Sequence, residues 1–313
     1  MRSQSFCFLL VILFTSCTQE INLKQSDTIQ YPVMSGLISP DRNSNIYLGK
    51  TLNILGQTQE VLEWTNIELR MNGIRVIGFR NQDLSLITIP ADVLIEGSSY
   101  QIMVNLADGT EVSANDTIPV LVRIDQAEKV IGKTYDAYGT PHSDYSMTFT
   151  DPADIRNYYE LLIFTQRWMD TLILVGYHHN VEIADPVIQA EGILDYNPAS
   201  FVFSDDLFNG RSYTLNMKMK NEGLAQVSLH EPMINAGNGT FLVLRSVSKT
   251  YYDFRKSWIL HRRTQNRGAF NEEPLATILI GNPTPLYSNI TNGYGIFAAY
   301  SQDFIQVEMK KWQ

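Results

Sequence analysis

The sequence is poor in cysteine and in basic residues, and it has no long apolar run after its first residues. Two cysteines among 313 residues are too few for a disulfide framework. Lys and Arg number 24 against 33 Asp and Glu, which argues against nucleic acid as a partner, since binding it needs a basic footprint. No Gly-x-Ser-x-Gly elbow, Walker loop or Rossmann fingerprint is present, so no motif points to an enzyme class or to a cofactor.

The first residues have the parts of an export signal. Arg2 precedes the apolar run 6–14, which is shorter than the about 20 residues that cross a bilayer. The run Leu13-Phe14-Thr15-Ser16-Cys17 is similar to a lipobox, so we expect residues 1–16 to be removed and Cys17 to carry the lipid that anchors the protein to a membrane. An ordinary cleaved signal with an incidental cysteine is the alternative. Without Arg2 the mature chain has 23 basic and 33 acidic residues.

The next segments predict a tether and a first β domain. Residues 17–30 are mostly polar and are expected to form a lipidated tether. In residues 31–122 the apolar residues alternate with polar ones, as in antiparallel strands. Asn72-Gly73 and Asp108-Gly109 are typical hairpin turns, because these residues accept positive φ angles. The region is predicted to be an immunoglobulin-like or prealbumin-like β-sandwich.

Residues 123–313 predict a larger antiparallel β domain. Strands are expected at Asp144–Phe149 and Tyr158–Phe164, and the clearest alternation runs from Tyr213 to Met219. Asn221-Glu222-Gly223 is expected to reverse that strand into the next one, Ala225–Leu229.

One amphipathic helix interrupts this pattern, near residues 248–263. Tyr251, Phe254, Trp258 and His261 recur at helical spacing, and Ser248 is a suitable N-cap. The helix is expected to pack on the sheet of this second domain. The basic run His261–Arg263, with Arg267, then falls at its last turn, where cations meet the negative end of the helix dipole, although a phosphate or an acidic partner is the alternative.

Several stretches resemble one known family. They are Ser35–Ile38, Gly97–Tyr100 followed by Asp108-Gly109, Asn157–Tyr159, Ser204–Tyr213 and Tyr287–Phe297. Together they resemble the Bacteroidota lipoproteins of domain of unknown function 4249. The resemblance implies an outer-membrane lipoprotein encoded beside TonB-dependent receptors, and hence a role in capture or uptake at that membrane. It implies no activity and no catalytic residues.

The carboxylates and histidines do not form a recognisable reaction centre. Asp205 and Asp206 are adjacent, and side chains of neighbouring extended residues point to opposite faces. We therefore interpret Ser204–Gly210 as a turn in which an Asp caps backbone N–H groups. His178-His179, with Glu182 and Asp185, matches no zinc spacing and is more typical of an exposed hairpin loop than of a metal site.

The best binding candidate is the loop from Lys133 to Tyr145. It mixes Tyr, Gly and Asp as adaptable recognition surfaces do, and Tyr135, Tyr138 and Tyr145 are its candidate ligand-binding residues. Tyrosines at strand edges are also common core and rim residues.

Three functions remain open from the sequence. The first is an outer-membrane lipoprotein, on either membrane face, that is a non-enzymatic accessory binding or docking subunit of a TonB-dependent system for a small nutrient. The second is a hydrolase, which requires a cleft that joins two carboxylates with perturbed pKa values, drawn from Asp144, Glu160, Asp185, Glu191 and Asp205. The third is a structural envelope protein, and an exposed apolar or aromatic patch on the second domain would argue against it.

Overall fold

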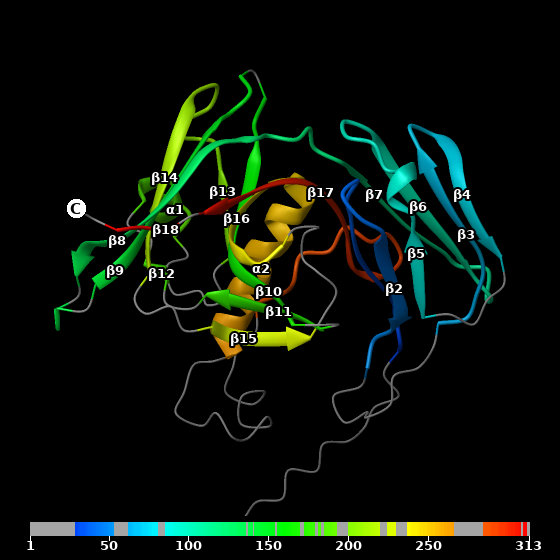
Figure 1. Ribbon diagram of the computed structural model, residues 1–313. Helices are drawn as coiled ribbons and strands as arrows, with labels where there is room; N and C mark the ends of the chain where they lie inside the picture. Colours follow the sequence, from blue (N-terminus) through cyan, green and yellow to red (C-terminus); the bar gives the residue numbers. More distant parts are fainter. Residues whose placement is uncertain are drawn as a thin grey trace, which may run out of the picture.

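The fold is that of a computed structural model (Figure 1), which describes most of the chain after the expected tether. The described residues are 29–52, 62–80, 85–135, 137–139, 141–153, 155–169, 172–178, 181–182, 185–192, 200–219, 224–229, 237–265, 284–307 and 309–311. The expected signal, Cys17 and nearly all of the tether lie outside them.

In the described part of the chain the strands form three sheets, and the protein is mainly β, as expected. The first sheet has nine strands in the order β15-β11-β10-β16-β17-β1-β2-β5, with β13 also paired to β10. Their bounds are β1 Pro32–Ile38, β2 Ser44–Lys50, β5 Leu86–Ile89, β10 Tyr158–Met169, β11 Leu172–His178, β13 Ser200–Ser204, β15 Leu224–Leu229, β16 Gly239–Val247 and β17 Tyr294–Val307.

The other two sheets are smaller. The five-stranded sheet has the order β12-β14-β9-β8-β18, and the four-stranded sheet has the order β4-β3-β6-β7. Their bounds are β3 Trp64–Met71, β4 Ile74–Arg80, β6 Ser99–Leu106, β7 Glu111–Thr117, β8 Ile124–Tyr135, β9 Pro141–Thr150, β12 Val181–Glu182, β14 Ser212–Met219 and β18 Met309–Lys311. A 3-10 turn, η2, spans Ala91–Val93, and the helices are α1 Pro186–Ala190 and α2 Lys249–Gln265.

The first β-sandwich packs β1, β2 and β5 against the four-stranded sheet. Tyr100, Ile102 and Val104 of β6 are fully buried in its core, as their alternation predicts. The β3–β4 hairpin closes at Asn72 and Gly73, whose φ angles of 50° and 85° are those of the favoured tight hairpin turn. Both local predictions are therefore confirmed.

The second core lies between the five-stranded sheet and the β10–β13–β16 part of the first sheet. Its aromatic centre consists of Phe149, Tyr159, Phe203 and Phe208, whose ring centroids lie 5.2 to 6.4 Å apart. Helix α2 covers the other face of the first sheet and forms a third cluster with Tyr158, Ile296 and Tyr300. Figure 1 shows α2 across the middle of the molecule.

Strand β17 connects the two halves. Its residues 294–299 pair with β1, and its residues 300–307 pair with β16. Phe297 packs in the first core, Ile296 under α2 and Val307 in the second core. The first sheet therefore continues across the predicted domain boundary at residues 122 and 123. Figure 1 shows β17, in red, between the strands of the first β-sandwich and those of the second core.

The structure corrects several local predictions. Strand β15 pairs with β11 in the first sheet, not with β14 as the expected Asn221–Gly223 hairpin requires; residues 220–223 lie outside the described part. Two strand pairs, β1–β17 and β18–β8, are parallel. The short helix α1 was not expected, and Asp185 is its N-cap.

The predicted helix is confirmed. Helix α2 begins at Lys249, directly after Ser248, whose hydroxyl accepts a 3.1 Å hydrogen bond from the Tyr251 N–H. His261–Arg263 lies near the end of the helix, and His261 Nδ1 lies 2.7 Å from the Thr284 carbonyl oxygen. Arg267 falls outside the described residues. Within those residues no helix combines the length and the apolar character that a membrane span requires.

Candidate functional site

The segment Lys133–Tyr145 is mostly a β-hairpin rather than the predicted loop. Strand β8 continues to Tyr135, and β9 begins at Pro141. The hairpin leaves Tyr135 60% and Tyr138 94% exposed. Tyrosines held this far out of the core present most of their ring surface to solvent.

A hollow of about 380 Å³ lies beside this hairpin. Its floor is the outer face of three paired strands, since residues two apart along a strand share a face. Residues that pair across β8, β9 and β14 form two rows on this face. The first row is Glu128, Ser146 and Asn216, and the second is Val130, Asp144 and Lys218. Lys133, Thr134, Tyr145, Asp185, Pro186 and Met217 complete the lining. The hollow therefore offers both amines and carboxylates to a ligand.

The side chains at the hairpin end of the hollow are held in place by each other. The Thr134 hydroxyl lies 3.0 Å from both carboxylate oxygens of Asp144 and 3.2 Å from His142 Nδ1. Tyr145 is 2% exposed, with Lys129 Nζ 5.5 Å from its ring centroid. Of the three candidate tyrosines, only Tyr145 lines the hollow, and its ring belongs to the second core.

Asp185 closes the hollow at the start of α1. Its Oδ1 accepts hydrogen bonds from the Val187 N–H at 3.0 Å and the Tyr213 hydroxyl at 2.7 Å, and its Oδ2 accepts one from the Asn216 N–H at 3.1 Å. Burial and this carboxylate raise the pKa of Tyr213 above its ordinary value. Asp185 thus joins α1 to β14, which is a structural role.

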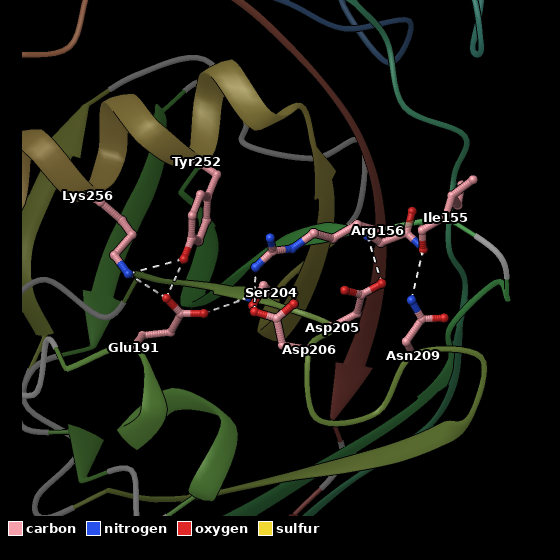
Figure 2. A network of polar contacts seen from close by, with 10 residues as sticks. Ile155, Arg156, Glu191, Ser204, Asp205, Asp206, Asn209, Tyr252 and Lys256 are labelled. Atoms are coloured by element: carbon pink, nitrogen blue, oxygen red, sulfur yellow. Dashed lines mark hydrogen bonds and ion pairs between the residues drawn. The ribbon is translucent and has the colours of Figure 1, made fainter.

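Asp205 and Asp206 form a turn, as predicted, and their carboxylates have different partners. Figure 2 shows Asp206 reaching Arg156 at the surface, an ion pair of 2.5 Å. Asp205 is fully buried, and its Oδ2 accepts a 2.7 Å hydrogen bond from the Asn157 N–H. Burial raises the pKa of Asp205, and that backbone hydrogen bond opposes the shift. The predicted capping therefore acts on a neighbouring segment rather than on the turn itself.

A second polar group, also in Figure 2, connects α1 to α2. The Glu191 carboxylate accepts hydrogen bonds from the Ser204 N–H at 2.8 Å, from Lys256 Nζ at 2.6 Å and from the Tyr252 hydroxyl. Burial alone would raise the pKa of Glu191, but these donors outweigh it and the pKa is lowered. The carboxylate is held ionised by the helix that packs over it.

A third polar group lies under α2 and centres on Glu160, which is 1% exposed. Arg245 Nη1 lies 2.9 Å and Arg255 Nε 3.2 Å from its carboxylate oxygens. The hydroxyls of Ser200, at 2.5 Å, and Tyr251, at 2.6 Å, also donate to it. Burial opposes ionisation of Glu160, but the two guanidinium groups outweigh it and its pKa is lowered.

Reasoning from the sequence missed this ion-pair group, although a signal was present. Glu160 interrupts the apolar run of β10, and Arg245 interrupts that of β16. A charge at the centre of an apolar strand requires a buried partner. Two such interruptions in neighbouring strands could have predicted the pair.

The histidine cluster is only partly described. His178 ends β11, and His179 lies outside the described residues. In the part of the chain that the structure describes, no three His, Cys, Asp or Glu side chains come together as metal ligands would.

The stretches that carried the family resemblance hold the fold together. Asp151 accepts hydrogen bonds from the Tyr159 hydroxyl and, at 2.8 Å, from the Gly210 N–H, so it joins Asn157–Tyr159 to the Ser204–Tyr213 stretch. Asn289, in the last stretch, Tyr287–Phe297, donates to the Phe297 carbonyl at 2.7 Å and accepts from its N–H at 3.0 Å. These motifs are therefore structural.

The sheets and cores define a mainly β protein with one long helix, and the comparisons agree with the resemblance. The family model of domain of unknown function 4249 (DUF4249) matches residues 18–305, so the chain belongs to this family. A comparison with curated proteins finds no match.

Proposed function

We propose that the protein is a lipid-anchored outer-membrane lipoprotein that serves as an accessory binding or docking subunit of a TonB-dependent uptake system. The observation that carries the proposal is the β8–β9 hairpin, which presents Tyr135 and Tyr138 to solvent beside the polar hollow. The lipobox-like run that ends at Cys17 supports the anchor, and the resemblance stated from the sequence implies the transport partner.

The hairpin suits a protein partner and the hollow suits a small polar nutrient. Exposed tyrosines supply large contact areas at low conformational cost, which is why they are frequent in binding surfaces. The hollow lies within the size range of ligand pockets, about 300–1,000 Å³. Lys218 and Asp144 lie in one row on its floor, so a ligand with both donors and acceptors fits it best.

A hydrolase is the second candidate, because two of the five carboxylates named above line the same hollow, Asp144 and Asp185. The hydrogen bonds to both oxygens of Asp185 favour a capping role over proton transfer. Glu160, Glu191 and Asp205 lie in the buried polar groups described above. The docking proposal is therefore preferred.

The experiment is an affinity pull-down of the natively lipidated full-length protein from gently solubilised envelopes, with partners identified by mass spectrometry. We expect stoichiometric recovery of a TonB-dependent receptor, and loss of that recovery in Cys17→Ala and in Tyr138→Ser. Leu207→Ser is the matched surface control, since Leu207 is 56% exposed and precedes Ser212, at the end of β14 that is remote from the hairpin. Recovery of no receptor, or equal recovery with Tyr138→Ser, contradicts the proposal.

A further inference from the structure

Four exposed apolar or aromatic side chains gather where the described chain begins. They are Ile29, Tyr31, Leu52 and Tyr294, with exposed fractions of 73%, 44%, 51% and 53%. The rings of Tyr31 and Tyr294 meet edge to face, with centroids 5.4 Å apart. The Thr51 N–H donates to the Tyr31 carbonyl at 2.9 Å, which holds the residue before Leu52 beside Tyr31. We refer to these four residues as the entry patch.

Two residues of the entry patch, Tyr31 and Tyr294, line a hollow of about 640 Å³ at one end of the first sandwich. The hollow is lined by Tyr31 at the start of β1, Lys50 at the end of β2, Leu106 at the end of β6 and Tyr294 at the start of β17. The strand ends therefore converge on one rim. Leu62 and Pro32 add further apolar surface to it.

The opposite end of the same sandwich is marked by Ile74, which is 71% exposed. Trp64 pairs with Leu106 at the patch end, and Met71 pairs with Ile74 at the far end. The seven steps of β3 between Trp64 and Met71 separate the two ends by about 23 Å, at roughly 3.3 Å per residue.

The chain that leads to Cys17 leaves from the entry patch. Cys17 and Ile29 are twelve residues apart in the sequence, a span of about 40 Å at full extension and roughly 20 Å on average for a flexible chain. A surface tethered this closely has a high effective concentration at the membrane, of the order of millimolar, so a weak affinity is enough for contact.

We propose that the entry patch rests on the lipid bilayer that holds the acyl chains of Cys17. Tyrosine is enriched at membrane interfaces, because its ring favours the apolar side and its hydroxyl the headgroups. Ile29 and Leu52 extend the same surface. This contact would orient the first sandwich with Ile74 away from the membrane. The inference rests on the lipidation of Cys17, which is part of the proposed function.

The test uses single reporters on the lipidated full-length protein. The mature chain has no cysteine besides Cys17, so Leu52→Cys and Ile74→Cys can each carry one environment-sensitive fluorophore. Both replace an exposed aliphatic residue of the first sandwich and leave the two tyrosines intact. The proteins are reconstituted in phosphatidylethanolamine–phosphatidylglycerol vesicles with and without spin-labelled lipid as quencher.

We expect loss of most of the fluorescence at position 52 and little change at position 74. Adding Tyr31→Ser and Tyr294→Ser should restore the signal at position 52. Flotation of the protein with the vesicles but equal, weak quenching at both positions would overturn the membrane contact alone. Failure of the protein to float would overturn the lipid anchor and the contact together.

Discussion

The buried ion pair under α2 leads to a sharp prediction for the substitution Glu160→Gln. The change keeps the shape of the side chain but removes the negative charge that faces Arg245 and Arg255. Breaking a buried pair by removing one partner costs about 3–5 kcal/mol, because the remaining charge stays desolvated. Two guanidinium groups remain here, so we expect at least about 3 kcal/mol of lost stability.

The matched control is Asp206→Asn, which breaks an ion pair at the surface. The side chains of Arg156 and Asp206 are 57% and 54% exposed, and pairs of this kind contribute only about 0–1 kcal/mol. Urea unfolding followed by tryptophan fluorescence measures both variants against the parent protein. Equal costs for the two substitutions would refute the reasoning.

The pH dependence of the same variant gives a second readout. The pKa of Glu160 is lowered on folding, so its stabilising effect is present above the unfolded pKa and is lost as the pH falls through the folded value. The stability difference between the parent protein and Glu160→Gln should therefore shrink in acid. A difference that is constant down to strongly acidic pH would contradict this assignment.

Three further predictions concern the strands that join the two halves. Burial raises the pKa of Asp116 from 3.8 to about 6. The stability that protonated Asp116 contributes is therefore full below the unfolded pKa and is lost as the pH rises through about 6. Between pH 4.5 and pH 8, the free energy of unfolding of Asp116→Asn should rise relative to that of the parent protein by on the order of 1–3 kcal/mol. Gly295 has a φ of 119°, and a Cβ there would lie 2.0 Å from the Met34 carbonyl oxygen. Gly295→Ala should therefore lower the melting temperature clearly more than Gly109→Ala, whose φ is 88° with open space around it; equal shifts would argue against this contact. Asn289→Ala removes three hydrogen bonds to the backbone of β7 and β17 and should cost about 2–3 kcal/mol in urea unfolding, and a cost near zero would show that water replaces them.

Local chemistry could be predicted from the sequence because it depends on neighbouring residues. The Asn72-Gly73 turn and the Ser248 cap are both confirmed. Each needs only a residue type with a special backbone preference or a side-chain acceptor.

Long-range pairing could not be predicted in the same way. A turn signal after β14 indicates where a strand ends, but not which strand receives the next one, and β15 pairs with β11. Likewise, β1 and β17 lie at opposite ends of the chain and pair in parallel. Their alternation shows that each has a buried face, and it carries no information on the partner.

The candidate site, too, depends on strand pairing that the sequence does not reveal. The composition of the segment predicts Tyr135 and Tyr138 as binding candidates, and the structure shows that both side chains are exposed on the hairpin. The hollow beside it could not be foreseen, because Asp144 and Lys218 are brought into one row by the register of β9 and β14. They are far apart in the sequence, so the pairing of these two positions cannot be read from it.

The measurement that tests the central claim most directly is photo-crosslinking in living cells from a photoreactive residue at position 138. The account predicts an adduct between the full-length lipidated protein and a TonB-dependent receptor, and none from the same residue at position 207, on the Ser204–Gly210 turn. No receptor adduct from position 138, or adducts of equal yield from both positions, would contradict the docking role of the hairpin.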